Sequence, residues 1–122
     1  MIVPFSVTDF IERAAAVYGE RPGFIDEPDQ PAASLGTLTY AEAYELARRQ
    51  SAKLDELELE AGDRVAIISH NSARLLTSFF GVCGSGRVLV PINFRLRPDE
   101  IAYIVAHSAR GWSTSTRSWW TR

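Results

Sequence analysis

Glycine-rich loops bind phosphates through backbone N–H groups, and the chain holds one candidate for such a loop. Gly81, Gly84 and Gly86 lie close together, after a run of apolar residues at helical spacing. A dinucleotide-binding loop follows a strand and opens a helix, so that the phosphate meets the helix N-terminus. These glycines instead close a predicted helix. We therefore interpret them as a helix ending and not as a phosphate site.

The run Ser69-His70-Asn71-Ser72 is a second candidate, because it follows a predicted strand. Open parallel sheets bind ligands at the carboxyl ends of their strands, and His70 could touch a substrate there. The alternative, which we favour, is a surface-loop histidine that caps a helix or contacts solvent.

Other reactive side chains have simpler structural interpretations. His107 lies near the predicted end of a helix, where its charge complements the helix dipole. Asp99 and Glu100 are typical of a first helical turn, and Cys83 is expected to be a small core residue. One cysteine excludes an internal disulfide, and neither a metal-ligand cluster nor a catalytic triad is visible. The sequence therefore assigns no catalytic, cofactor-binding or metal-binding residue.

A strand–helix–strand–helix unit between Gly62 and His107 must position these residues. The four adjacent apolar residues Val65–Ile68 predict a parallel strand covered by helices on both faces. The expected elements are a helix that Ser72 caps and Gly84-Ser-Gly86 ends in the left-handed conformation, a strand at Val88–Ile92, and a helix from Pro98 to about His107. The predicted apolar positions of the two helices are Leu75, Leu76, Phe79, Phe80 and Cys83, then Ile101, Ile104 and Val105. The fold class is α/β, with a partial parallel sheet of the doubly wound type and flanking helices.

The N-terminal half is predicted to add two helices and two short strands. Ser6 or Thr8 caps a helix that runs to Tyr18, and its expected apolar face is Phe10, Ile11, Ala14 and Val17. Short strands are expected at Phe24–Ile25 and at Leu38. Thr39 and Glu42 form a capping box for a long helix whose apolar side is Tyr40, Ala43, Tyr44, Ala47, Leu54 and Leu57.

Composition narrows the class of protein. The chain has 122 residues, 46% hydrophobic and 23% charged, which is typical of one small globular domain. A net charge of −2 gives no electrostatic reason to expect nucleic acid or an anionic membrane as partner. No apolar run is long enough for a transmembrane segment, and the N-terminus lacks the basic start of a signal peptide. We expect a cytoplasmic protein.

Two segments together resemble the adenylate-forming acyl-CoA synthetases, the AMP-binding ligases. They are LTYAEAYELARRQSAKL and GDRVAIISHNSARLLTSFFGVCGSGRVLVPINFRLRPDEIAYIVAHS. The second is close to the family pattern "G-x-V-x-VP-I-N-x-R-L" followed by "E-I-x-Y-I-x-x-H-S". The resemblance covers about Phe10 to Arg110, and residues 1–110 would be the N-terminal portion of the ligase domain. PINFRL is most similar to ligases that act on fatty or related carboxylic acids.

The resemblance implies an activity for the family. Its members activate a carboxylate with ATP and Mg²⁺ to an acyl-adenylate, release pyrophosphate, and transfer the acyl group to coenzyme A. The family's phosphate loop, ribose-binding aspartate and C-terminal lysine match nothing here, so no catalytic residue is carried over. We expect this chain to lack independent activity and to bind none of these cofactors alone.

Residues 111–122, GWSTSTRSWWTR, depart from the family pattern and contain all 3 tryptophans. A membrane- or nucleic-acid-contacting tail is one interpretation, and a structureless end is the one we favour over it. With GC-rich codons, one added G at the start of this segment turns it into GVVHVHPELVDA, an apolar strand followed by a helix start. We therefore hypothesise a shifted reading frame or a sequencing error, with residues 1–110 as a truncated ligase.

Open sheet edges in such a fragment favour aggregation or self-association. Two other functions stay open. One is a stand-alone α/β module that binds a nucleotide or an acyl group, and the other is an interaction protein that pairs its sheet edge with another chain.

Overall fold

The computed structural model describes residues 5–31 and 33–108. Its elements, in chain order, are α1 (Val7–Tyr18), β1 (Pro22–Ile25), β2 (Thr37–Thr39), α2 (Tyr40–Glu56), β3 (Arg64–Ser69), α3 (Ala73–Cys83), β4 (Val88–Asn93) and α4 (Pro98–Ser108). All the elements expected from the sequence are present. The segment 111–122, with its proposed frame change, lies outside the described residues.

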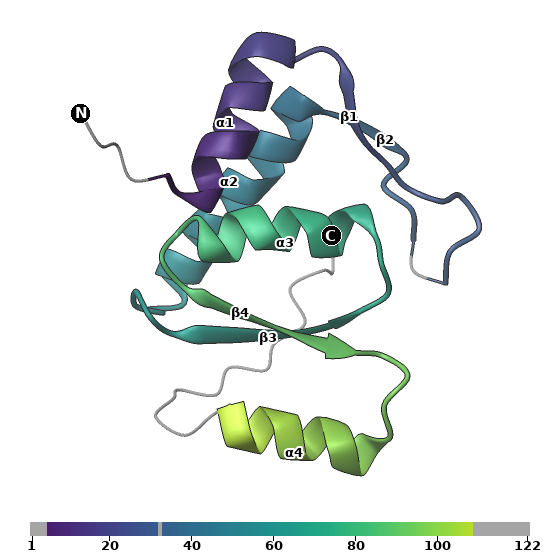
Figure 1. The fold of residues 1–122 in the computed structure, drawn as a ribbon, viewed down its shortest axis with the longest axis vertical. Coiled ribbons are helices and arrows are strands. Elements are labelled where there is room, and N and C mark those ends of the chain that lie inside the picture. Colours follow the sequence, from purple (N-terminus) through teal and green to yellow (C-terminus); the bar gives the residue numbers. More distant parts are fainter. Residues whose placement is uncertain (1–4, 32, 109–122) are drawn as a thin grey trace.

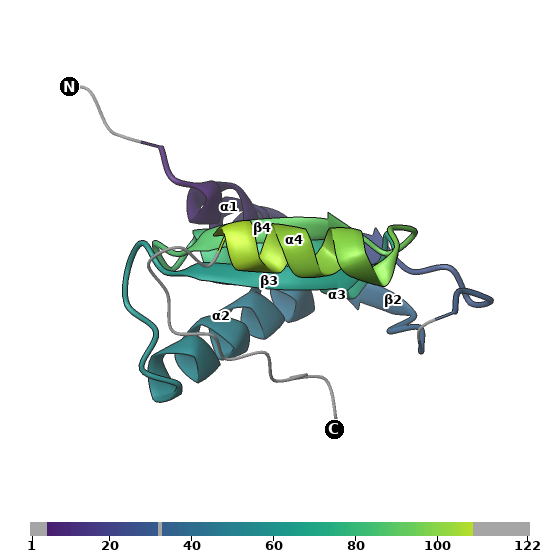
Figure 2. The ribbon, with the colours of Figure 1, turned by 90° about the horizontal axis from the view of Figure 1, so that it is seen from below.

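The strands form two separate pairs. β3 and β4 run parallel in continuous register from Arg64 opposite Val88 to Ser69 opposite Asn93. β1 and β2 form an antiparallel pair with an irregularity at Pro22 and Phe24. The parallel pair confirms the predicted α/β class, and Figure 2 looks onto one face of this pair, with α4 in front of it and running roughly along the strands.

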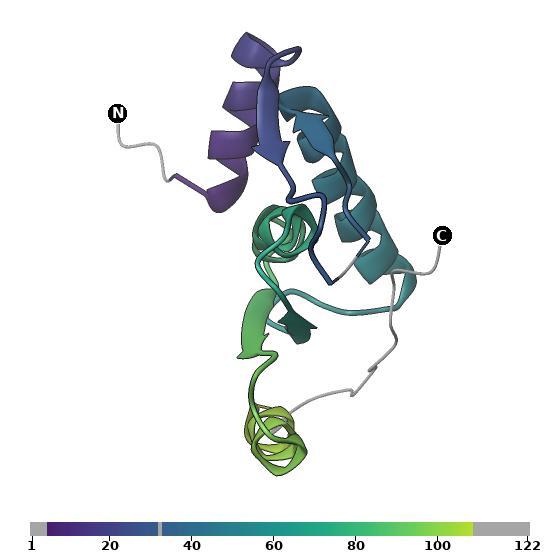
Figure 3. The ribbon, with the colours of Figure 1, turned by 90° about the vertical axis from the view of Figure 1, so that its right-hand side faces the viewer.

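The elements stack in layers around α3. Figures 1 and 3 show α1 and α2 together on one side of α3, and the β3–β4 sheet on its other side. α4 covers the opposite face of this sheet. α3 therefore contacts helices on one side and strands on the other. Among the described elements, β4 is the one against which α4 packs most closely. The two helices that follow β3 and β4 thus lie on opposite faces of the sheet.

Side-chain caps fix where the helices begin. Ser6 is the N-cap of α1, and its backbone N–H donates to Asp9 at 2.5 Å. The predicted capping box of α2 is confirmed: Glu42 N donates to Thr39 Oγ1 at 3.2 Å, and Thr39 N donates to the Glu42 carboxylate at 2.8 Å. The hydrogen bond from the Thr39 backbone lowers the pKa of Glu42 below its usual value. Ser72 caps α3, as expected.

Removing the α2 cap should have a measurable cost. We expect Thr39→Ala to lower the free energy of unfolding by about 1 kcal/mol, because the Glu42 N–H loses its acceptor. Thr37→Ala, two residues earlier in β2, is the matched control and should change it by less than half as much. Urea unfolding followed by circular dichroism measures both. Equal effects of the two variants would contradict the assignment of the cap.

Small residues allow α2 and α3 to approach closely. Ala43 and Ala47 of α2 are buried, and so are Thr77, Ser78 and Gly81 of α3. A Cβ at Gly81 would lie 2.9 Å from the backbone oxygen of Ala47, closer than real Cβ atoms approach. The structure therefore requires glycine at this crossing.

This close contact explains where the predicted apolar faces are wrong. We expected Leu76 and Phe79 to lie on the buried side of α3, but they are 44% and 40% exposed, because α3 turns its small residues toward α2. On α1, Ile11 is buried as expected, whereas Phe10 and Val17 are exposed. Helical spacing predicts which apolar residues share one face of a helix. Which of these residues are buried depends on how closely the neighbouring helix packs.

The turn that precedes β4 confirms the predicted ending of α3. The helix ends at Cys83, directly before Gly84-Ser-Gly86. Gly84 keeps a right-handed φ of −65°, and Gly86 has φ +79°, a value that glycine adopts most readily. Gly86 is therefore the residue of this run that takes the left-handed conformation.

Arg87, directly before β4, joins this strand to the loop that follows α2. It is 7% exposed, and its guanidinium donates to the backbone oxygen of Leu59 and, at 2.6 Å, to Asp55 Oδ1. Leu59 belongs to the small apolar core with Leu54 and Val82. One buried cation therefore fixes the position of the α2–β3 connection over this core.

Candidate functional site

The carboxyl ends of β3 and β4 bring two polar loops together. Residues 70–72 follow β3, and residues 94–97 follow β4. The rings of His70 and Phe94 meet between them, with centroids 3.6 Å apart and planes inclined by 36°. His70 is half-buried by this contact, and Ser69 Oγ donates to its backbone oxygen at 2.8 Å. Residues from two neighbouring strands therefore form one surface where parallel sheets bind ligands.

Two arginines flank this surface. The Arg95 guanidinium lies 5.3 Å from the centroid of the Phe94 ring, and the Arg95 backbone N–H donates to Asn93 Oδ1 at 3.0 Å. Arg97 pairs with Asp99 at 2.9 Å, and its backbone N–H donates to Glu100. Asp99 and Glu100 therefore interact with the residue that opens α4, which agrees with their interpretation as helix-start residues.

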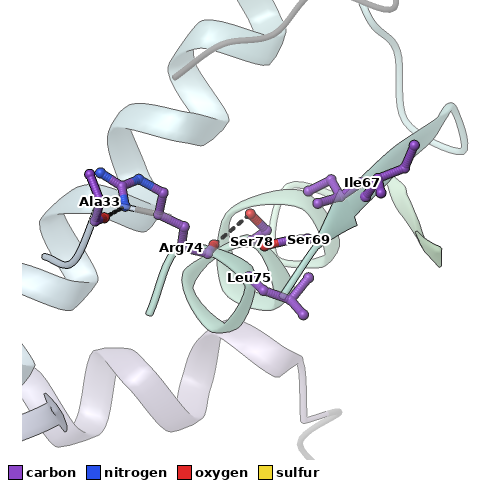
Figure 4. Close-up of a pocket in the computed structure, with 7 residues that line it drawn as sticks. Ala33, Ile67, Ser69, Arg74, Leu75 and Ser78 are labelled. Atoms are coloured by element: carbon purple, nitrogen blue, oxygen red, sulfur yellow. Dashed lines mark hydrogen bonds between the residues drawn. The ribbon is translucent and has the colours of Figure 1, made fainter. Parts of the chain in front are cut away.

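A cavity lies between the carboxyl half of β3 and the first half of α3. Its volume is about 290 Å³. Figure 4 shows Ile67 of β3 on the right, Arg74 and Ala33 on the left, and Ser69 and Ser78 between them, with Leu75 of α3 below. Its lining residues are Ala33, Ile67, Ile68, Ser69, Arg74, Leu75 and Ser78. Ser78 Oγ donates to the backbone oxygen of Arg74 at 2.9 Å and accepts from Gln50 at 3.0 Å. The cavity is mainly apolar, with one arginine at its rim.

Asp26 holds the remaining wall of this cavity in place. It is 7% exposed, and its Oδ1 accepts from the Ala73 N–H, the first of α3, at 2.9 Å. Its Oδ2 accepts from Gln30 Nε2 at 2.8 Å and from the Leu35 N–H at 3.1 Å. The loop between β1 and β2 is thereby fixed to the start of α3. Arg74 adds a hydrogen bond to the backbone oxygen of Ala33.

The charge of Asp26 depends on these donors. Burial raises the pKa of its carboxyl group, but the hydrogen bonds from Leu35, Ala73 and Gln30 and the charge of Arg74 outweigh that effect. The pKa therefore lies below its ordinary value, and Asp26 is ionised at neutral pH. Its oxygens already have three donors, so it acts on the structure of the site and not as a base.

The other residues considered from the sequence lie away from this surface. Cys83 is half-buried at the end of α3, in keeping with a packing role. The ring of His107 stacks on Tyr103 of α4, with centroids 5.6 Å apart. Gly81 packs on α2, and Gly86 forms the turn before β4. The sequence predicted the loop after β3, but it did not predict that His70 contacts Phe94.

Two contributors were missed from the sequence. Phe94 reaches His70 only because β3 and β4 are in parallel register, which puts Ser69 opposite Asn93. Asp26 bonds Ala73 across 47 residues of sequence. The only local feature that could have indicated the role of Asp26 is its position directly after a short strand. Many exposed acidic residues in loops have the same position.

Among the described residues, this surface presents two rings, two arginines and a serine hydroxyl. Within residues 5–31 and 33–108, no three His, Cys, Asp or Glu side chains gather to hold a metal ion. In the same part of the chain, no helix combines the length and apolar character needed to cross a membrane.

Comparison with known proteins gives a consistent result. The model of the AMP-binding enzyme family matches residues 11–110. The long-chain-fatty-acid–CoA ligase of Thermus thermophilus is 42% identical over 105 residues, which are 82% of this chain and 18% of that protein. The 4-hydroxybutyrate–CoA ligase 2 of Metallosphaera sedula is 36% identical over 99 residues, 81% of this chain and 17% of that protein. The chain thus spans less than a fifth of the length of these relatives.

Solved structures of similar fold include the N-terminal domain of FACL13 from Mycobacterium tuberculosis. It is 31% identical with a TM-score of 0.75, over 85% of this chain and 25% of that one. The anthranilate CoA ligase AuaEII, in complex with anthranoyl-AMP, is 27% identical with a TM-score of 0.74, over 86% of this chain and 19% of that one.

Proposed function

Because the chain belongs to the AMP-binding enzyme family, we propose that it forms the first part of the large N-terminal domain of an ATP-dependent acyl-CoA ligase. The observation that carries this proposal is the match of residues 11–110 to the family together with the fold of a ligase N-terminal domain. The parent reaction would join a carboxylic acid to coenzyme A through an acyl-adenylate, with release of AMP and pyrophosphate.

We infer a fatty or related carboxylic acid as the substrate of the parent ligase. The names of similar relatives support this class, since they include ligases for long-chain fatty acids and for 4-hydroxybutyrate. A compartment with reduced thiols, such as the cytoplasm, agrees with the single half-buried cysteine.

ATP, Mg²⁺ and coenzyme A would be the cofactors of the complete ligase. Its ATP would supply the adenylate leaving group that makes the carboxylate reactive toward a thiol. The described residues contain no cluster of metal ligands, so we assign Mg²⁺ to no residue of this chain. The contribution of residues 5–31 and 33–108 is a framework that ends in the His70–Phe94 surface.

We further propose that the 122-residue chain has no ligase activity by itself and tends to self-associate. Its short span relative to the ligases supports the first point. Both β3 and β4 have one edge without a strand partner among the described residues, and Leu76 and Phe79 are partly exposed. Such edges and apolar side chains favour association between copies.

A chimera tests the proposed function. Residues 5–108 replace the matched segment of the Thermus ligase, and the product is supplied with palmitate, ATP, Mg²⁺ and coenzyme A. We expect pyrophosphate release and acyl-CoA formation at a rate of the same order as the parent ligase. The isolated 122-residue chain, assayed in parallel, should release no pyrophosphate above a no-enzyme blank.

The controls separate function from folding. Circular dichroism and size-exclusion chromatography establish that the chimera folds. A folded chimera that forms no acyl-adenylate would contradict the proposed function. Pyrophosphate release by the isolated chain, or its thermal stabilisation by ATP or coenzyme A, would favour a stand-alone binding module.

A further inference from the structure

We propose that the outward face of α1 is the contact surface of a symmetric homodimer, in which the α1 helices of two copies of this chain pack antiparallel. The proposal rests on the self-association proposed above, and it assigns that association to a helix face and not to the edges of β3 and β4. Four residues form this face, named the outer stripe: Val7, Phe10, Ala14 and Val17.

α1 has two apolar faces, and the fold uses only one of them. The inner face is buried at Ile11, and its Thr8 lies against Gly84 at the end of α3. The outer stripe repeats at spacings of three, four and three residues, so its members share an arc of about 80° on the helix. The three charged residues of α1 fall outside this arc. Figures 1 and 3 show α1 at the margin of the described chain, where a second molecule can reach it.

The larger side chains of the outer stripe are open to solvent. Val7, Phe10 and Val17 are 42%, 67% and 58% exposed. Phe5, directly before the N-cap, is 83% exposed, and its ring centroid lies 6.3 Å from that of Phe10. This pair has the positions of a hydrophobic staple, which extends the apolar patch without covering it. A contiguous apolar patch on a small protein is typical of an interaction surface.

The spacing of the outer stripe is complementary to itself. Because three–four–three is the same from either end, a twofold axis that makes the helices antiparallel sets Val7 against Val17 of the second copy. The same axis sets the large ring of Phe10 against the small side chain of Ala14, and such alternation of large and small residues packs well. A twofold pair covers the same patch on both molecules. We therefore assign the outer stripe to a second copy and not to an unrelated helix.

The size of the patch indicates a weak dimer. An aromatic side chain offers about 150–250 Å² of surface, so the exposed parts of Phe5 and Phe10 amount to roughly 300 Å². With the two valines, the patch reaches roughly 400 Å² per copy, which is within the range of functional patches on monomeric proteins. Two such patches in contact would bury roughly 800 Å², less than the approximately 1,200 Å² at which stable complexes begin. We therefore expect a dissociation constant on the order of 100 μM.

Sedimentation velocity of the 122-residue chain tests the proposal. Concentrations from about 5 to about 500 μM bracket the expected dissociation constant, and we expect a reversible monomer–dimer equilibrium. Ala14→Glu should raise this constant at least about tenfold, because it puts a charge at the centre of the contact. Ala16→Glu is the matched control, since Ala16 lies on the same helix but is exposed and outside the arc of the outer stripe. It should leave the constant within about twofold of that of the unsubstituted chain.

Disulfide trapping tests the orientation of the two helices without adding a charge. In a Cys83→Ser background, a chain with Val7→Cys is mixed with a chain with Val17→Cys, and the mixture is oxidised. An antiparallel pair joins the two kinds of chain to each other, because residue 7 of one copy faces residue 17 of the other. A parallel pair would join each kind of chain to itself. Circular dichroism establishes that every variant keeps its helices.

A third variant separates this contact from association through the sheet. Ile68 of β3 is 52% exposed, so Ile68→Glu puts the same charge on the sheet edge. If Ile68→Glu abolished association and Ala14→Glu did not, self-association would stand and the α1 contact would be overturned. Equal effects of Ala14→Glu and Ala16→Glu, or disulfides only between chains of one kind, would also overturn it. A monomer at every concentration would overturn self-association as well, whereas the ligase function is tested separately by the chimera.

Discussion

Asp26→Ala should lower the free energy of unfolding by about 3 kcal/mol, the larger of the two effects expected from single substitutions here. The substitution leaves three donors without their acceptor: the backbone N–H groups of Leu35 and Ala73 and the side chain of Gln30. Asp26 is almost completely buried, so water does not readily replace the carboxylate. Urea unfolding at low protein concentration, followed by circular dichroism, measures the loss.

The dependence on pH gives a second, independent measurement. The pKa of Asp26 is lower in the folded chain than its ordinary value, so the folded state binds its proton less readily than the unfolded state. Its stabilising contribution is complete above the ordinary carboxyl pKa, and it is lost as the pH falls through the folded pKa. Asp26→Asn should therefore flatten the acid side of the stability profile.

Asp29→Ala is the matched control for Asp26, because Asp29 lies in the same loop but is exposed. Its effect should stay within about 0.5 kcal/mol, with an unchanged pH profile. Hydrogen exchange at the Ala73 amide should accelerate in Asp26→Ala and not in Asp29→Ala. An unchanged Ala73 exchange rate in Asp26→Ala would show that the loop is held by other contacts.

Arg87→Met should cost about 2–3 kcal/mol of unfolding free energy. Methionine keeps much of the aliphatic volume but removes the donors to the buried backbone oxygen of Leu59 and to Asp55. The connection between α2 and β3 would lose its attachment to β4. We expect a lower urea midpoint and faster proteolysis within residues 57–63.

Two variants separate the parts of this interaction. Asp55→Ala should cost well under half as much, because Asp55 is 67% exposed and Arg87 keeps its bond to Leu59. Arg48→Met, at a surface arginine 66% exposed, controls for the loss of a cation and should have little effect. If Arg87→Met behaved like Arg48→Met, the buried guanidinium would not be a determinant of stability.

The sequence predicted every element of the fold because each has a local signal. Caps at Ser6, Thr39 and Ser72 mark helix starts, and runs of apolar residues mark β3 and β4. The apolar faces were harder to predict. Exposure of Leu76 and Phe79 follows from the contact between Gly81 and α2, and that contact joins segments that are distant in sequence.

The candidate site was predicted only as a location. A predicted strand followed by the loop Ser69–Ser72 indicates a position where open parallel sheets bind ligands. This prediction needs only the order of the elements along the chain. The contact of His70 with Phe94 depends on the register between two strands, and the bond of Asp26 to Ala73 depends on the packing of a distant loop. Neither pairing has a counterpart in local composition.

The unpaired edge of β3 also bears on how the protein is made. β3 leaves the ribosome roughly 24 residues before its partner β4. At about 5–20 residues per second, the growing chain would present this apolar edge for a few seconds. Pairing between distant strands is slow, so contacts with other nascent chains compete during that interval. Until β4 pairs with it, β3 is thus a segment at which a chaperone would limit association between chains.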